Sequence, residues 1–256
     1  RSLFGLAVSL YTSRIVLNSL GIDDYGIYNV VGGMVAMFSL LSNSLSTAIS
    51  RYLTFELGKE NIDKLRTIFS SSVVIQTGLA LFILLLVEIF GICFLNLYIN
   101  IPAGRLEAAH WALQCSAITF AVGLISIPYN ATIIAHEKMV FFAYISILEQ
   151  VLKLIVAYLL YISPFDKLKI YAFLLVIVSI LIRAIYGMYC KRQFEECNGK
   201  IIIDKSFIRQ MVDFAGWNFL GAGSGVLMTQ GVNILMNLFF TVAVNAARGV
   251  ATQIEG

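Results

Sequence analysis

The sequence predicts an all-α, polytopic membrane protein, and three observations support this class. Of the 256 residues, 59% are hydrophobic and only 13% are charged, and the mean hydropathy is +0.85. Soluble domains carry about 25% charged residues, so about half of the charge that a soluble enzyme needs is absent. The apolar residues also fall in runs long enough for helices that cross a hydrocarbon core about 30 Å thick.

Seven candidate spans follow one another along the chain, each an apolar run bounded by charged or turn residues. They are residues 2–20, 26–50, 68–95, 110–135, 139–162, 170–190 and 212–241. Residues 21–24, Gly-Ile-Asp-Asp, have the composition of a tight turn between the first two spans. Residues 51–69 carry charges between apolar side chains, a pattern that predicts either an interfacial helix or, as the less favoured alternative, a solvated charged loop; the apolar positions are Leu53, Leu57, Ile62, Leu65 and Ile68.

Loop charges predict the orientation. The connections after spans two, four and six carry ten Lys and Arg residues, whereas those after spans one, three and five carry three. The positive-inside rule therefore places the first set, and the N-terminus, in the cytoplasm. We expect a fragment made of an N-terminal six-helix lobe at residues 1–190, a cytoplasmic linker at 191–211, and a truncated C-terminal lobe at 212–256 that holds only its first helix.

Charged side chains inside the spans mark the candidate substrate-binding site, because an intramembrane charge is costly and normally faces protein or a hydrated cavity. Arg14, Lys153 and Arg183 are candidates for contact with an anionic substrate. Glu149 stands four residues before Lys153, which favours a helical ion pair. The pair either neutralises itself or leaves Lys153 available to a substrate, and each arginine either faces a cavity or snorkels toward the bilayer surface.

Polar and small residues form stripes at helical spacing on the second, fourth and seventh spans, among them Gly32, Ser116 and Thr119. Such stripes either allow close helix packing or line a wet cavity. Asn29 and Asn43 on these stripes are further candidate cavity residues. Secondary candidates are Asn18, Glu88, Asn218 and Asn233.

No pattern in the sequence predicts catalysis, a metal or a cofactor. The two histidines lack ligands at metal spacing, and no nucleophile and base stand out as a pair. The four cysteines form no CxxC motif and are expected to be small buried hydrophobes: Cys93, Cys115, Cys190 and Cys197.

Residues 13–61 carry a resemblance to a known family. They read SRIVLNSLGIDDYGIYNVVGGMVAMFSLLSNSLSTAISRYLTFELGKEN, with the segments YGIYN and SRYLTFELGKEN around a helix rich in small residues. This stretch resembles the start of bacterial polysaccharide flippases, whose superfamily also contains the multidrug and toxin extrusion (MATE) transporters. The segment IPYN followed by HEKM is similar to that family's fourth helix and inner turn, and residues 214–249 are similar to the opening of its second lobe.

The resemblance implies a MATE-like fold of two six-helix lobes, with alternating access to a central cavity. It implies a non-enzymatic carrier that flips an undecaprenyl-pyrophosphate-linked oligosaccharide across the bacterial inner membrane during polysaccharide or lipopolysaccharide biosynthesis. Arg14, Lys153 and Arg183 would hold the anionic headgroup. The implied partners are the lipid-linked oligosaccharide, membrane lipids, and a polysaccharide polymerase or glycosyltransferases, with no nucleic acid.

Two alternatives stay open at this point. A cation-coupled multidrug antiporter of the same superfamily would use intramembrane acids, for which Glu88 and Glu149 are available. A membrane-embedded glycosyl or acyl transferase would need an acidic or histidine cluster at a membrane face.

Overall fold

A computed structural model of the protein describes residues 2–36, 38–97, 103–164, 166, 167–198, 202, 204–214, 216–217 and 221. All elements assigned in these ranges are helical. They are α1 Ser2–Leu20, α2 Ile22–Ala36, α3 Ser39–Leu57, α4 Ile62–Leu86, a π-helical segment Val87–Gly91, α5 Ile92–Leu97, a 3₁₀ turn Ala103–Arg105, α6 Leu106–Ala135, α7 Met139–Ile162, α8 Lys167–Gln193, a 3₁₀ turn Glu195–Asn198, and a helical stretch at residues 205–214.

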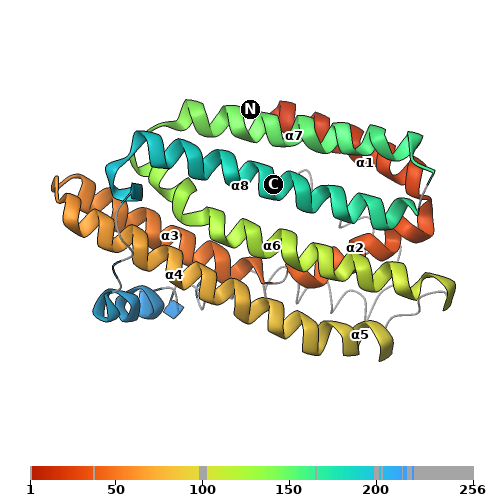
Figure 1. Ribbon diagram of the computed structural model, residues 1–256, viewed down its shortest axis with the longest axis horizontal. Helices are drawn as coiled ribbons and strands as arrows, with labels where there is room; N and C mark the ends of the chain where they lie inside the picture. The colour runs from red at the N-terminus through yellow and green to blue at the C-terminus, as the bar shows by residue number, and fades with distance from the viewer. Residues whose placement is uncertain are drawn as a thin grey trace.

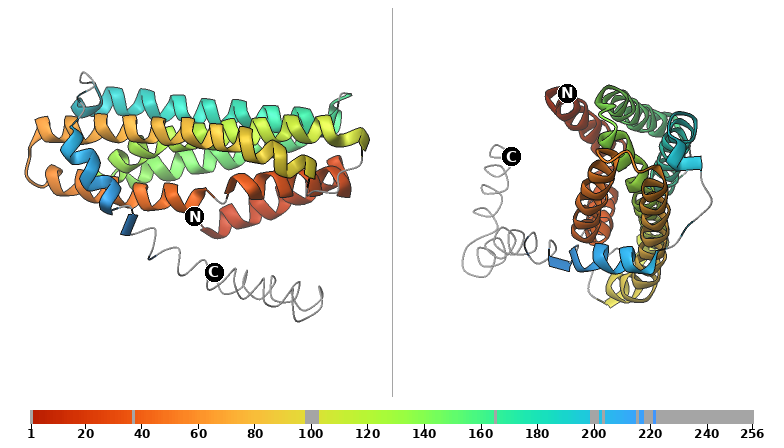
Figure 2. Two further views of the ribbon diagram at one scale, coloured as in Figure 1. Left: turned by 90° about the horizontal axis from the view of Figure 1, so that it is seen from below. Right: turned by 90° about the vertical axis from the view of Figure 1, so that its left-hand side faces the viewer.

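The helices lie side by side in one elongated bundle (Figures 1 and 2), and α6 is its central member. It packs against α2, α3, α4, α7 and α8, while α1 packs mainly against α7. Ala109 and Ala112 of α6 are fully buried in the core, and small residues of this kind let neighbouring helices approach closely.

Four stretches of the described residues are long and apolar enough to cross a membrane: Ile62–Gly91, Leu106–Ala135, Met139–Ile162 and Lys167–Gln193. Their outward faces keep large apolar side chains exposed, such as Phe90 and Ile162 at 65% and 81%. Apolar surface of this extent is typical of a face that contacts lipid.

The helix bounds follow local sequence signals. Gly21 adopts a left-handed φ of +84°, which glycine tolerates without strain, and so ends α1 directly before α2. Asn61 begins α4 because its side-chain oxygen accepts a hydrogen bond from the backbone N–H of Lys64 at 3.1 Å. The predicted bounds of the first and fifth spans match α1 and α7. The third prediction, 68–95, is covered by α4, the π-helical segment and α5 together, and α6 and α8 each extend the corresponding prediction.

Two predictions about the second span and its surroundings are wrong. The single helix expected at 26–50 is two helices, since α2 ends at Ala36 and α3 begins at Ser39. Gly32, Gly33 and Ser39 flank this break, and helices are known to kink at Gly and Ser. Residues 21–24 are not a four-residue turn either, because only Gly21 separates α1 from α2.

The interfacial helix expected at residues 51–69 is also absent from the described residues. This segment consists of the end of α3, a tight turn and the start of α4. Glu60, at a φ of +55°, completes the turn. Three of the apolar positions that suggested an interfacial helix instead face the bundle, where Leu53, Leu65 and Ile68 are 1%, 3% and 5% exposed, whereas Ile62 is 47% exposed.

Part of the segment expected to be a linker is folded against the bundle. Its helical stretch at 205–214, blue in Figures 1 and 2, lies at the same end of the bundle as the α3–α4 turn. Phe207 and Met211 are buried there against residues of α3, α4 and α6. The predicted seventh span, apart from residues 212–214, 216–217 and 221, lies outside the described residues.

Candidate substrate-binding site

Lys153 and Glu149 form an ion pair on α7. The Lys153 Nζ lies 2.6 Å from Glu149 Oε1, and the two side chains are 40% and 37% exposed. Their spacing of four residues places both on one helix face. The positive charge of Lys153 is therefore largely neutralised within its own helix.

Arg183 is a partly buried cation on α8. Its guanidinium carbon lies 3.7 Å from the centroid of the Tyr129 ring on α6, a cation–π contact. Gly187, one turn further along α8, leaves room for the guanidinium. A Cβ on residue 187 would lie only 2.8 Å from Arg183 Nη1. Within the described part of the chain, the buried Nε has no hydrogen-bond partner and no acidic side chain pairs with the guanidinium.

Arg14 and Asn18 are exposed on α1, one helical turn apart. Neither side chain makes a hydrogen bond or an ion pair with any other described residue. Because Tyr11 is also exposed, residues 11, 14 and 18 place a tyrosine, an arginine and an asparagine on one face of this helix.

The three candidate cations lie at different depths. Arg14 and Lys153 stand six and nine residues before the ends of α1 and α7, and Arg183 stands sixteen residues after the start of α8. These helix ends lie at one end of the bundle, so a rise of 1.5 Å per residue places the cations about 9, 14 and 24 Å from it. The arrangement spreads positive charge along the membrane normal, and a chamber shared by all three stays a prediction.

The remaining candidate residues are dispersed. Asn29 and Asn43 are exposed on α2 and α3. Glu88 lies in the π-helical segment, where its carboxylate accepts a hydrogen bond from the Gln114 amide on α6. Asn218 and Asn233 lie outside the described residues.

Two of the predicted small-residue stripes meet around a cavity. Gly32 of α2 and Ser116 and Thr119 of α6 line it together with Tyr28 and residues of α8, and its volume is about 190 Å³. Here the stripes leave space between helices, while the alanines of α6 elsewhere serve close packing.

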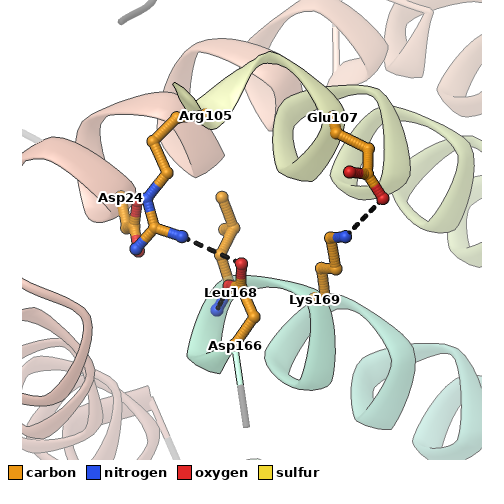
Figure 3. Close-up of polar contacts among 6 residues, drawn as sticks. All are labelled: Asp24, Arg105, Glu107, Asp166, Leu168 and Lys169. Atoms are coloured by element: carbon orange, nitrogen blue, oxygen red, sulfur yellow. Dashed lines mark hydrogen bonds and ion pairs between the residues drawn. The ribbon is translucent and has the colours of Figure 1, made fainter. Parts of the chain in front are cut away.

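A cluster of charged residues at the end of the bundle where α1 and α7 finish has no counterpart in the sequence predictions (Figure 3). Arg105 donates to Asp24 Oδ2 at 2.7 Å and to Asp166 Oδ2 at 2.9 Å, and Lys169 lies 2.6 Å from Glu107 Oε1. Asp166 also caps α8, because its Oδ1 accepts from the backbone N–H of Leu168. The cluster ties α2, α6 and α8 together.

The cysteines follow the prediction in three cases out of four. Cys115, Cys190 and Cys197 are buried, whereas Cys93 is exposed on α5, so the expectation for Cys93 is wrong. Cys197 lies just after the end of α8. The pKa of its thiol is raised mainly by a hydrogen bond with Cys190 and secondly by burial. Among the described residues, no group of three or more His, Cys, Asp or Glu side chains is arranged to hold a metal ion.

Comparison with known proteins identifies the family. The MatE family profile matches residues 2–159, which is more than half of the chain and extends from α1 through most of α7. No curated protein and no solved structure matches the chain. The matched region contains most or all of three of the four membrane-spanning stretches and two of the three candidate cations, Arg14 and Lys153, whereas α8 and Arg183 follow it. The chain therefore belongs to the MatE family and is a multi-pass membrane transporter.

Proposed function

We propose that this transporter is a flippase for an undecaprenyl-pyrophosphate-linked oligosaccharide. It acts by alternating access in the bacterial inner membrane, during polysaccharide or lipopolysaccharide biosynthesis. The observation that carries the proposal is Arg183, a cation inside a membrane-spanning helix that pairs with no acidic side chain among the described residues.

The chemistry of Arg183 suits a pyrophosphate headgroup. A guanidinium donates parallel hydrogen bonds to phosphate oxygens, and Coulomb attraction is stronger in a medium of low dielectric than in water. The Tyr129 ring holds the guanidinium by its face. This contact fixes the position of the cation without using its hydrogen-bond donors.

Arg14 on α1 provides a second cation that pairs with no acidic side chain among the described residues, and it lies nearer than Arg183 to the end of the bundle where α1 finishes. Lys153 contributes less in this proposal because Glu149 already neutralises it. An anionic headgroup would pass from one arginine to the other as the carrier changes conformation.

The lobe organisation and orientation belong to the same proposal. Residues 1–190 form the first six-helix lobe, 191–211 the inter-lobe connection and 212–256 the start of the second lobe, with the N-terminus in the cytoplasm. The ends of α1 and α7 then face the outside, together with the Arg105 cluster.

The carboxylates that an antiporter would use are both occupied. Glu88 accepts from Gln114, and Glu149 pairs with Lys153. A proton or a cationic drug would have to displace these partners, and for this reason we propose a flippase rather than a multidrug antiporter.

The test is transport in proteoliposomes. A fluorescent polyprenyl-pyrophosphate oligosaccharide is placed in the bilayer, and its arrival in the outer leaflet is followed by quenching with an impermeant reductant. We expect the protein to translocate it and Arg183→Gln to slow it by about 10-fold or more, as loss of a charged hydrogen bond predicts. Lys169→Gln, which removes a charge at the end of the bundle, is the matched control and keeps the wild-type rate.

Two results would overturn the proposal. One is translocation by Arg183→Gln at the wild-type rate. The other is a protein that leaves the lipid-linked oligosaccharide in place and instead accumulates a cationic dye against a proton or sodium gradient, as an antiporter does.

A further inference from the structure

A polar cavity lies at the end of the bundle where α3 finishes and α4 begins. Its volume is about 420 Å³, which is within the size range of ligand pockets. The end of α3, the start of α4 and residues 204–210 form its walls, and the helical stretch at 205–214 is blue at that end of Figures 1 and 2. The rings of Tyr52 and Phe207, which meet edge to face with centroids 5.1 Å apart, join α3 to this stretch.

Two carboxylates line the cavity. Glu56 is 8% exposed, and in the part of the chain that the structure describes its Oε2 has no hydrogen-bond partner, while its Oε1 lies 3.5 Å from the Lys59 ammonium. Asp204 caps the helical stretch, because its Oδ1 accepts from the backbone N–H groups of Ser206 and Phe207 at 2.8 and 3.3 Å. A carboxylate as buried as Glu56 is costly unless a positive charge compensates it, so the cavity favours a cationic group.

Lys64 of α4 also lines the cavity, and its side chain is exposed. Among the described residues, the Lys64 ammonium forms an ion pair with neither Glu56 nor Asp204. Charges of both signs therefore border one cavity without contacting each other. Each of them attracts the opposite charge of a bound molecule. The cavity thus suits a small ligand that carries both a positive and a negative group.

The cavity lies where the bundle meets the membrane surface. Lys64 and Thr67 belong to the start of the membrane-spanning stretch Ile62–Gly91, and headgroups surround the ends of such stretches. Phe55 lines the cavity yet is 59% exposed, and Val212 on the helical stretch beside it is 53% exposed. Exposed apolar side chains beside a polar cavity suit a lipid whose head enters the cavity and whose chains run along the bundle.

We infer that this cavity binds the head of an aminophospholipid, an ethanolamine phosphate ester. The primary ammonium of the lipid has three N–H donors for the carboxylates of Glu56 and Asp204, and its phosphate suits the Lys64 ammonium. A choline lipid lacks these donors, and a glycerol phosphate lipid has no positive group for the carboxylates. The bound lipid ties residues 204–214 to α3 and α4. This site is separate from the cations proposed to carry the substrate and does not depend on that proposal.

Lipid binding to the whole, delipidated protein in detergent tests the site by native mass spectrometry. The probes are dioleoyl lipids with ethanolamine, choline or glycerol phosphate heads, and soluble ethanolamine phosphate as a competitor. We expect the protein to retain the ethanolamine lipid with an affinity about 10-fold or more above that for the other two lipids. Bound ethanolamine lipid is also expected to slow tryptic cleavage after Lys205.

Variants locate the binding. Glu56→Gln/Asp204→Asn removes both negative charges at nearly constant size, and asparagine caps helices as well as aspartate does. This variant is expected to weaken binding of the ethanolamine lipid by about 10-fold or more, and Lys64→Gln, at an exposed position, is expected to weaken it as well. Glu60→Gln/Asp63→Asn removes two exposed charges at the same end outside the cavity and is the matched control with wild-type affinity.

Three results would overturn the inference. One is equal affinity for the three lipids, or tighter binding of the glycerol phosphate lipid. The second is wild-type affinity for the ethanolamine lipid in either cavity variant, and Lys64→Gln decides alone if the double variant does not fold. The third is displacement of the lipid by an equal concentration of soluble ethanolamine phosphate, which would make the free zwitterion the ligand.

Discussion

The guanidinium of Arg105 contacts the carboxylate of Asp24 across 81 residues of sequence, with Nη2 and Oδ2 2.7 Å apart. The Asp24 side chain is only 4% exposed, whereas Arg105 is 40% exposed. The same guanidinium reaches Asp166 at the start of α8. One side chain thus fixes the relative positions of α2, α6 and α8 at this end of the bundle.

Arg105→Gln is expected to destabilise the protein by about 2 kcal/mol, because it leaves the buried Asp24 carboxylate without its charged donor. The partial exposure of Arg105 keeps the loss below that of a fully buried pair. Thermal unfolding of the protein in detergent measures the change. Lys169→Gln is the control, since its partner Glu107 is 88% exposed; a shift as large for this variant would contradict the account.

Gln76 tests how a buried side-chain amide without hydrogen bonds affects the stability of the protein. It is fully buried on α4, and among the described residues neither atom of its amide group has a hydrogen-bond partner. Replacing an unpaired buried amide with an apolar group of similar size stabilises, so Gln76→Leu is expected to raise the free energy of unfolding by about 1 kcal/mol. Gln114→Leu, which removes the partner of Glu88, is expected to lower it. A lower melting temperature for Gln76→Leu would contradict this prediction and show that the Gln76 amide makes hydrogen bonds.

Met211 anchors the helical stretch at 205–214 to the bundle. It is fully buried with Phe207 in the cluster formed by α3, α4 and α6. Met211→Ala removes about 2–4 kcal/mol of packing, and is expected to speed tryptic cleavage after Lys205 or Arg209 by about 10-fold or more. Val212→Ala, at a position 53% exposed, provides the control. Equal cleavage rates in both variants would refute the docking of this stretch.

The raised pKa of Cys197 predicts low thiol reactivity. Because the hydrogen bond with Cys190 and burial raise that pKa, the thiolate fraction stays negligible as pH rises from neutral to about 9. In a Cys93→Ser/Cys115→Ser background, a maleimide is expected to label neither Cys197 nor the fully buried Cys190 over this range until a denaturing detergent unfolds the protein. Mass spectrometry of the labelled peptides measures this, and labelling of native Cys197 that increases with pH would contradict it.

Helix positions were predictable from the sequence where a long apolar segment lies between turn residues. The bounds of α1 and α7 follow from predominantly apolar runs that end at turn or charged residues, although each run contains charged side chains. The Lys153–Glu149 pair was predictable for a similar reason, because a spacing of four suffices to bring two helical side chains together.

Features that depend on distant residues were not predictable. Nothing near Arg105 signals contacts with carboxylates 81 and 61 residues away, and nothing near Arg183 signals the ring of Tyr129. The division of the second span into α2 and α3 was not predictable either, because residues 26–50 contain no charged residue that would mark a break in the helix.

The most direct test of the carrier mechanism is glycan export by the triple variant Arg14→Gln/Lys153→Gln/Arg183→Gln. Export is measured in bacteria that lack their own flippase, at equal abundance of the protein in the membrane. Lys138→Gln/Lys191→Gln/Arg192→Gln, which removes three exposed charges outside the candidate site, serves as the control. The account predicts that the first variant abolishes export and that the control supports it. Normal export by the first variant would contradict the role of intramembrane cations in carrying the anionic headgroup.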